Sequence, residues 1–253
     1  METPSFQDYF SKQASDYAKY RPHYPEELFA YLATLVTHHE TAWDCATGNG
    51  QVAIGLMPYF QTIYATDASA TQIANAFPHD RIHYSVAPAR SSGLPDHSVD
   101  LITVGLALHW FDLEPFYQEV RRVAKPQGAI AVWGTGMPVM PTAPQAVQSL
   151  LKEFDQMIQP FKPPQVQLVD EEYKTVPFPF DEVVTPAFTR TIAWTAEQFM
   201  GYVSTWSATQ LFAERHGWSA IAQFSDQLKL AWGGAALRPV EWSIYLRAGQ
   251  IND

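Results

Sequence analysis

Short apolar runs alternate with segments of helical spacing in the amino-terminal half of the chain. The runs have the length of strands and lie at residues 42–46, 62–67, 82–86, 99–106 and 128–133. The fourth run is apolar almost throughout, as expected of a strand that is buried on both faces. Between the runs, the sequence predicts helices at about residues 51–57, 69–76 and 116–124. This alternation predicts a parallel sheet with helices on both faces.

The carboxyl-terminal half follows another pattern. Residues 136–187 hold many of the 19 prolines and contain one predicted helix, at about 143–158. A capping box formed by Thr195 and Gln198 predicts the start of a further helix. Counting the five runs above, we expect a Rossmann-like, mostly parallel α/β sheet of seven strands, covered by a helical cap from this half of the chain. The two strands that complete the sheet are predicted at 189–194 and 240–246.

Composition narrows the classes of partner. The chain of 253 residues carries 16 basic and 26 acidic side chains, a formal net charge of −10, which opposes binding to nucleic acid or to an anionic membrane. Cys45 is the one cysteine, so neither an internal disulfide nor a cysteine-built zinc site is possible. No segment approaches the ~20 apolar residues of a membrane helix, and the amino terminus lacks the pattern of a signal peptide. We therefore expect a cytoplasmic protein without a metal site.

A glycine-containing turn follows the first predicted strand and carries the candidate chemistry. The segment reads Asp44-Cys45-Ala46-Thr47-Gly48-Asn49-Gly50, and Asp67 ends the second strand. Glycines let a backbone approach a bulky ligand closely, and the amide groups at the start of the next helix can bind a polar group. A carboxylate at the position of Asp67 can accept both hydroxyls of a ribose. The arrangement predicts a nucleoside-containing cofactor.

Two cofactors fit this turn. Residues 48–53 satisfy the Gly-x-Gly-x-x-Ala pattern of nicotinamide dinucleotide enzymes. Asp44, however, would face the pyrophosphate of such a cofactor unfavourably, because like charges repel. A carboxylate there suits the ammonium or sulfonium group of S-adenosylmethionine, which has no phosphate. The chain also lacks a recognisable Tyr-x-x-x-Lys pair for carbonyl reduction.

These residues resemble the class I S-adenosylmethionine-dependent methyltransferases. The resemblance rests on Asp44-x-x-x-Gly48-x-Gly50, on Asp67, and on the segments at 94–100 and 119–128. Three further segments are similar to the group around trans-aconitate methyltransferase, at residues 17–25, 106–111 and 205–208.

The resemblance implies one methyltransferase domain over residues 1–253. Its parts would be an arm (1–24), a cofactor-binding core (25–135), cap segments (136–187 and 195–235) and closing strands (188–194 and 240–248).

The resemblance also assigns the candidate site. Cofactor contacts are expected from Tyr20, Arg21, Asp44, Ala46, Gly48, Gly50, Asp67, Ala68, Ala87, Ala89 and Leu106. His109, Trp110 and Trp206 would contact the substrate, and His109 and Tyr17 are the candidate catalytic residues. Two positions depart from the family. Ala46 stands where a glycine is usual, which is tolerable if its φ is negative, and Arg90 stands where a glutamate is frequent.

The implied reaction is an in-line transfer of a methyl group from S-adenosylmethionine to a small molecule such as a carboxylic acid. A carboxylate acceptor needs no base, whereas a phenol, an amine or a carbon acid would require proton removal by His109 or Tyr17. The net charge disfavours a polyanionic acceptor unless arginines gather at the pocket, and the candidates are Arg21, Arg90, Arg190 and Arg215. We expect a monomer or a homodimer. The alternatives are an NAD(P)-dependent oxidoreductase and a non-catalytic binding module with a methyltransferase fold.

Overall fold

The computed structural model describes residues 23–252. Five parallel strands form one half of a sheet, in the order β3-β2-β1-β4-β5, and three antiparallel strands complete it. The parallel strands are β1 (Thr41–Cys45), β2 (Thr62–Asp67), β3 (Ile82–Val86), β4 (Val99–Gly105) and β5 (Ala124–Thr135). Order reverses between β1 and β4, so the carboxyl ends of these two strands are the expected place for a ligand.

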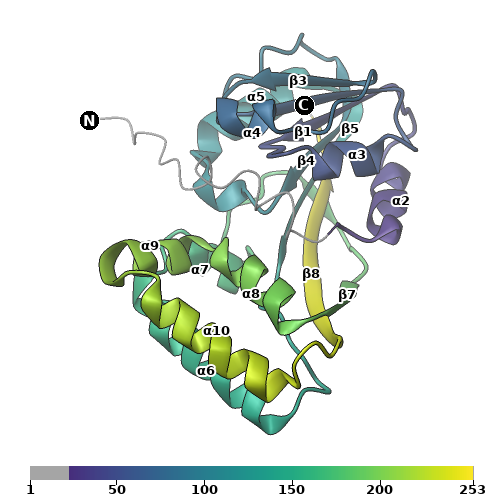
Figure 1. The fold of residues 1–253 in the computed structure, drawn as a ribbon. Coiled ribbons are helices and arrows are strands. Elements are labelled where there is room, and N and C mark those ends of the chain that lie inside the picture. Colours follow the sequence, from purple (N-terminus) through teal and green to yellow (C-terminus); the bar gives the residue numbers. More distant parts are fainter. Residues whose placement is uncertain (1–22, 253) are drawn as a thin grey trace.

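Helices cover both faces of the parallel strands (Figure 1). On one face lie α2 (Glu26–Thr34) and α3 (Gln51–Leu56), and α5 (Leu113–Val123) packs on the other. Alternation along the strands divides the core in the same way. Ala42 and Leu101 face α2 and α3, whereas Trp43 and Ile102, one residue further along each strand, face α5. The short helix α4 (Ala70–Ala74) follows β2.

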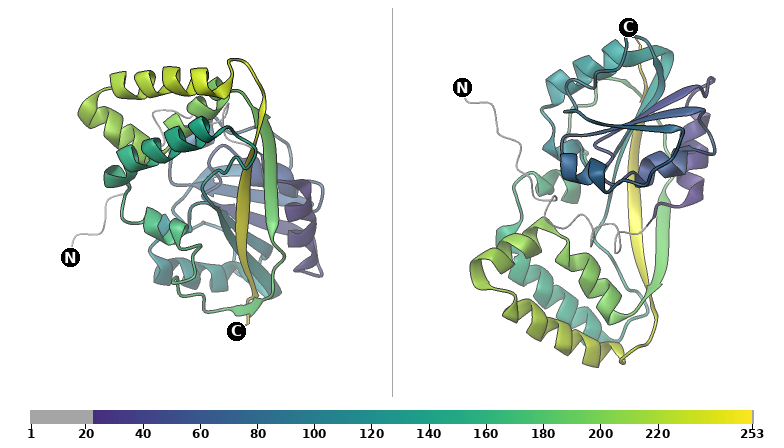
Figure 2. Two further views of the ribbon diagram at one scale, coloured as in Figure 1. Left: turned by 90° about the horizontal axis from the view of Figure 1, so that it is seen from below. Right: turned by 45° about the horizontal axis from the view of Figure 1, so that its top comes forward.

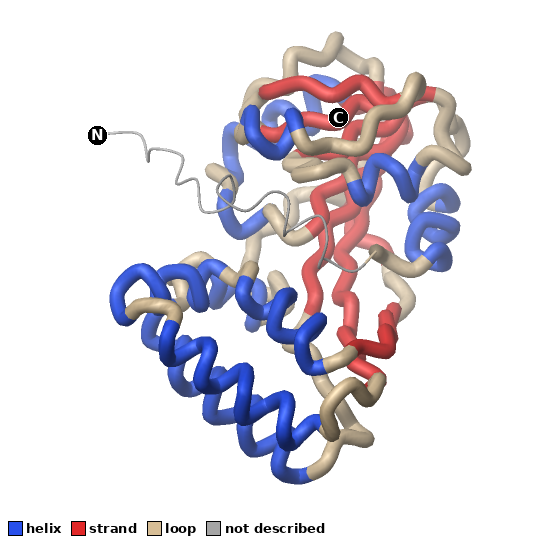
Figure 3. Tube along the Cα trace, viewed as in Figure 1, coloured by secondary structure: helices blue, strands red, loops and turns tan. Residues whose placement is uncertain are grey.

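The carboxyl-terminal half adds a second layer beside the sheet (Figures 2 and 3). Its helices are α6 (Gln145–Ile158), α7 (Val166–Asp170), α8 (Ala196–Ser204), α9 (Ser207–His216) and α10 (Ser219–Trp232). The long helices enclose a separate apolar cluster, in which the rings of Phe154 and Phe224 lie 4.7 Å apart. Thr195 and Gln198 form the predicted capping box. The expected helical cap is therefore present.

The sheet has eight strands, one more than predicted. The closing strands β7 (Phe188–Trp194) and β8 (Arg238–Gln250) pair with one another, and β8 also pairs with β5. The additional strand β6 (Asp181–Val183) pairs with the end of β8. Its first two residues are exposed and acidic. The sequence therefore has no apolar run here from which this edge strand could have been predicted. β5 and β8 also extend beyond their predicted ends.

β7 and β8 run from the parallel strands to the helical layer and thus connect the two parts of the molecule (Figure 1). Within residues 23–252, no helix combines the length and the apolar character needed to cross a membrane.

Candidate functional site

The turn after β1 has an unusual backbone. Ala46, Gly48 and Gly50 all have positive φ, at 57°, 57° and 91°. A Cβ at Gly50 would lie 2.2 Å from Tyr84 Oη, so this position requires glycine for space as well as for conformation. The condition that Ala46 has a negative φ is not met. An alanine in this region carries a cost of about 1–2 kcal/mol.

Asp67, the last residue of β2, is hydrogen-bonded to this turn. Its carboxylate accepts hydrogen bonds from the backbone N–H groups of Gly48, at 2.9 Å, and Ser69, at 2.8 Å. A carboxylate oxygen can accept more than one hydrogen bond. Ala87 donates its N–H to the Asp67 carbonyl, so the two expected ribose and adenine positions are neighbours. Ala68 is exposed in the same region.

Asp44 lies beneath the turn. Its carboxylate is buried and accepts hydrogen bonds from the hydroxyls of Thr47, at 2.5 Å, and Thr103, at 3.2 Å. Burial raises the pKa of Asp44 to about 7, although these hydrogen bonds oppose the shift. Asp44 lines neither of the two cavities described below, so its contact with a cofactor stays a prediction.

Around the turn, three buried polar atoms have no hydrogen-bond partner in the described part of the chain. They are Asn49 Nδ2, Gln72 Oε1 and Tyr84 Oη. Burial also raises the pKa of Tyr84 to about 12, so its phenol remains a hydrogen-bond donor. An unpaired buried polar group costs about 1–3 kcal/mol. A ligand with several hydroxyl or amino groups, such as a nucleoside, would supply the missing partners. The residues present therefore fit the cofactor that the turn predicts.

A small cavity of about 60 Å³ opens beside the turn. Ala46, Gly48 and Leu106 line it, together with Tyr24 and Arg190. Typical ligand pockets measure several hundred Å³, so a whole cofactor can enter only if the side chains at its border move. Among the described residues that line this cavity there is no carboxylate, and Arg190 is the one charged group.

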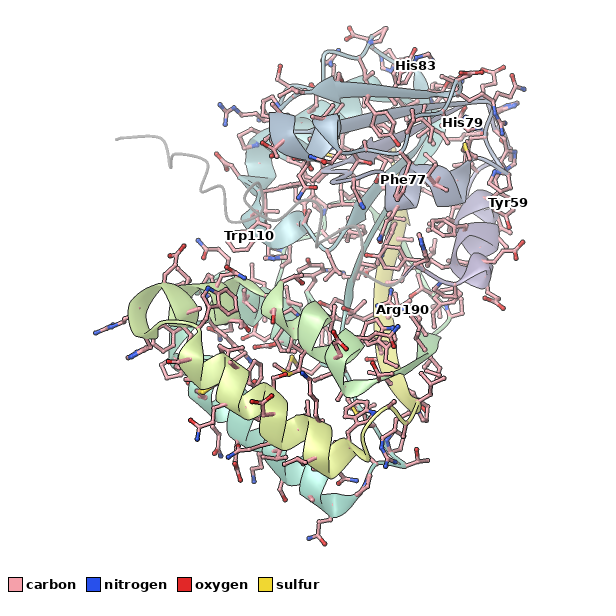
Figure 4. The ribbon with its side chains drawn as sticks, in the orientation of Figure 1. Tyr59, Phe77, His79, His83, Trp110 and Arg190 are labelled. Carbon is pink, nitrogen blue, oxygen red and sulfur yellow. The ribbon has the colours of Figure 1, made fainter. Side chains whose placement is uncertain are left out.

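Arg190 reaches this cavity from β7 (Figure 4). Its guanidinium lies over the ring of Trp242, at 4.8 Å, and over Tyr24, at 5.6 Å. Nη1 donates to the carbonyl of His23 at 3.3 Å. Of the three candidate arginines that the structure describes, Arg190 lines a cavity, whereas Arg90 and Arg215 are exposed. Arg21 lies outside the described residues.

A second cavity, of about 540 Å³, lies between the sheet and the helical layer. Leu106 and Tyr202 line both cavities, so the two meet at these side chains. Leu106 follows β4 and also has a positive φ, of 56°. Non-glycine residues in this conformation concentrate at functional sites.

All three predicted substrate residues line this larger cavity. His109 and Trp110 belong to the short 3-10 helix η2 (Leu108–Trp110), with their rings 4.7 Å apart. Trp206 precedes α9 and packs edge-on against Tyr202 at 5.5 Å. Two regions that are about a hundred residues apart in sequence thus meet at one cavity.

His109 is buried, and burial lowers its pKa to about 3. Its Nδ1 lies 2.8 Å from Tyr173 Oη. The lowered pKa makes the imidazole a weak base at neutral pH. Tyr17, Tyr20 and Arg21 lie outside the described residues, so their predicted roles stay predictions.

The sequence did not indicate Tyr173 or Tyr202 as site residues. Tyr202 looked like a core position of its helix, and Tyr173 lies in a segment without a recognisable motif. The charged residues of the larger cavity were also missed. These are Lys162, Asp170 and Glu172, of which Lys162 lies 3.7 Å from Asp170. No local pattern marks any of them, because the folding of the second half places them there.

Comparisons with known proteins identify the family of the chain. Residues 43–132 match the family described as a methyltransferase domain. A solved structure from Anaeromyxobacter dehalogenans, described as "a Putative Type II Methyltransferase", is 36% identical, with a TM-score of 0.82. That alignment covers 91% of this chain and 98% of the other.

Two other proteins are similar over most of their length. A "Putative methyltransferase" from Dictyostelium discoideum is 27% identical over 251 residues, which cover 96% of this chain and 95% of the relative. The structure of the YcgJ protein from Bacillus, at 17% identity and a TM-score of 0.53, covers 90% of this chain and 100% of its own. This last likeness shows the fold alone.

Proposed function

The chain belongs to the class I S-adenosylmethionine-dependent methyltransferases, and on that basis we propose that it methylates a small molecule held in the 540 Å³ cavity. The observation that carries this proposal is the junction of the two cavities at Leu106 and Tyr202. A methyl donor in the smaller cavity and an acceptor in the larger one would meet there.

The turn and its neighbours would hold the cofactor. The backbone of Gly48 and Gly50 permits close approach, and Asp67 is already oriented by two N–H groups to accept ribose hydroxyls. Arg190 would pair with the carboxylate of the methionine part, because it is the one charged group among the described residues that line the smaller cavity. When bound, S-adenosylmethionine supplies an electrophilic methyl group on a sulfonium. The chain's own contribution is alignment of the reactants and exclusion of water.

The acceptor is proposed to be a carboxylic acid with an apolar or aromatic body. Trp110, Trp206 and several aliphatic side chains form most of the cavity wall. A carboxylate oxygen is already a nucleophile, whereas other acceptors require a base. The low pKa of His109 makes it unsuited to that task at neutral pH. Lys162 is the one lysine or arginine among the described residues of the lining, and it faces Asp170 at 3.7 Å and Asp155 at 3.3 Å, so an acceptor carboxylate would compete with these side chains for it.

Thermal unfolding in the presence of S-adenosylhomocysteine tests the cofactor assignment. At 100 times its dissociation constant, a ligand stabilises the folded protein by about 2.7 kcal/mol, an increase in Tm of roughly 5–10 °C at this size. Asp67→Asn keeps the shape of the side chain and removes its charge, so the increase should be smaller. Asp226→Asn, on the exposed surface of α10, is the matched control and should respond like the wild type.

The same experiment with NADH separates the alternatives. Stabilisation by NADH alone would assign the turn to an oxidoreductase and overturn the proposal. If neither ligand stabilises the protein, a non-catalytic binding module becomes the better interpretation. If S-adenosylhomocysteine binds, release of this product with a panel of aryl and alkyl carboxylic acids, against the corresponding amines and phenols, tests the acceptor class.

A further inference from the structure

Tyr173 and His109 form a buried pair at the wall of the larger cavity. Tyr173 is completely buried, and its hydroxyl lies 2.8 Å from His109 Nδ1. The rings are stacked, with centroids 6.1 Å apart. Tyr173 comes from the turn after α7, and His109 from η2 after β4. The pair therefore joins the helical layer to the carboxyl end of the parallel sheet.

The hydrogen-bond donors and acceptors of Tyr173 and His109 determine which imidazole nitrogen carries the hydrogen. Burial holds the pKa of the Tyr173 phenol well above its usual value, so the hydroxyl keeps its hydrogen. A buried O–H requires an acceptor. Within residues 23–252, His109 Nδ1 is the one acceptor in contact with this hydroxyl. Nδ1 therefore accepts, and the neutral imidazole carries its hydrogen on Nε2.

The second ring nitrogen is available to a ligand. His109 lines the larger cavity. Its Nε2 has no hydrogen-bond partner among the described residues, yet it is not among the enclosed polar atoms that lack one. Since Nδ1 is directed at Tyr173, Nε2 lies on the other edge of the ring, where the cavity can reach it.

The backbone around Tyr173 has an unusual conformation that hydrogen bonds from Arg247 hold in place. Glu172 and Tyr173 have φ values of 56° and 55°, a conformation that costs energy in non-glycine residues. Arg247 Nη1 donates to the carbonyls of Tyr173, at 2.8 Å, and Val176, at 2.7 Å. Arg247 is itself held by two hydrogen bonds to Glu182. The strained turn is thus fixed from β8 and β6.

We infer that Tyr173 is a positioning residue that fixes the tautomer of His109, so that the imidazole presents a hydrogen-bond donor, Nε2–H, to the acceptor cavity. The tautomer does not depend on the proposed function. Its consequence does: a donor at this place orients an acceptor through a carbonyl or carboxylate oxygen and does not remove a proton from it. His109 then belongs to the substrate contacts and not to the bases.

Nuclear magnetic resonance of protein labelled with ¹⁵N-histidine tests the inference without any ligand. Long-range ¹H–¹⁵N correlations distinguish the two neutral tautomers, and the His109 signals are those missing from His109→Gln. We expect wild type to show one neutral form protonated at Nε2. In Tyr173→Phe the ratio of tautomers should shift toward Nδ1–H by roughly 2- to 10-fold, the equivalent of one hydrogen bond.

Tyr245→Phe is the matched control. Tyr245 belongs to the same aromatic cluster, 5.5 Å from the Tyr173 ring, but its hydroxyl donates to the carbonyl of Val169. Its removal should leave the tautomer of His109 unchanged. A wild-type signal protonated at Nδ1, or an unchanged ratio in folded Tyr173→Phe, would overturn the inference.

A second variant covers the case in which Tyr173→Phe does not fold. Incorporation of 3-fluorotyrosine at position 173 keeps the phenol and makes it a stronger donor, so the Nδ1 resonance should move in the direction of stronger hydrogen bonding. An unmoved resonance would contradict donation from Tyr173. Stabilisation of each variant by S-adenosylhomocysteine is measured in parallel, so that failure of the methyltransferase assignment is seen separately from failure of the tautomer assignment.

Discussion

The parallel strands and the antiparallel strands share one sheet but differ in how their residues are buried. β4 is buried along nearly its whole length on both faces, whereas β7 and β8 alternate between buried and partly exposed positions. The parallel half places its site residues at strand ends, where sequence position and spatial position coincide. The carboxyl-terminal half contributes Arg190 from β7, Tyr173 from the turn after α7 and Trp206 from the link between α8 and α9. The site residues at the ends of the parallel strands can therefore be predicted from the sequence pattern. The site residues of the helical cap can be identified only in the folded structure.

The largest expected effect is a loss of folding stability, and it tests whether the apolar core of the cap helices is independent of the cofactor site. Trp232 is completely buried among the cap helices, and its Nε1 donates to the Ala236 carbonyl. Trp232→Ala should lower the free energy of unfolding by about 3–5 kcal/mol, measured by urea denaturation. Trp218→Ala, at a half-exposed position before the same helix, should cost much less. If Trp232→Ala also abolishes binding of S-adenosylhomocysteine by the folded protein, the cap and the cofactor site are not independent.

The second prediction concerns the turn of the parallel half. Gly50→Ala introduces a positive-φ alanine and a contact with Tyr84, and should cost about 2–4 kcal/mol. Gly93 also has a positive φ, but a Cβ there would meet nothing within 4 Å. Gly93→Ala should therefore cost only about 1–2 kcal/mol. Equal losses in urea denaturation would show that Tyr84 moves away and that the crowding is not significant.

The third prediction is a pH dependence in the parallel half. The pKa of Asp44 is about 7 in the folded protein and near its ordinary value of 3.8 when unfolded. Between these values the folded state binds more protons, so its stability falls as the pH rises. Compared with Asp44→Asn, wild type should lose on the order of 2 kcal/mol between pH 5 and pH 8. Urea denaturation at several pH values measures the difference, and a constant difference would contradict the raised pKa.

The smallest expected effect has the opposite sign. Ala46 has a φ of 57°, so Ala46→Gly relieves backbone strain and should stabilise the protein by about 1 kcal/mol after the entropy cost of glycine. Ala222, exposed in the first turn of α10, is the control, and its replacement by glycine should destabilise by up to about 1 kcal/mol. A loss of stability in Ala46→Gly would mean that the methyl group has a packing role in the smaller cavity.

The sequence by itself determined the cofactor half of this protein. Apolar runs and helical spacing predicted the five parallel strands, and the Asp44–Gly50 turn with Asp67 indicated the cofactor class, because hydrophobic periodicity and turn chemistry are local properties. His109 and Trp110 could be proposed because they follow a parallel strand directly.

Only the tertiary structure determined which residues of the carboxyl-terminal half lie near the cofactor turn and His109. Tyr173 meets His109 across 64 residues of sequence, Arg190 reaches the smaller cavity from β7, and β6 pairs at the edge without an apolar run. These contacts depend on how the helical layer packs against the sheet, and packing is a property of the whole chain that no window of neighbouring residues contains. The positive φ of Ala46 belongs to the same class, since only the surrounding structure can hold an alanine in that conformation.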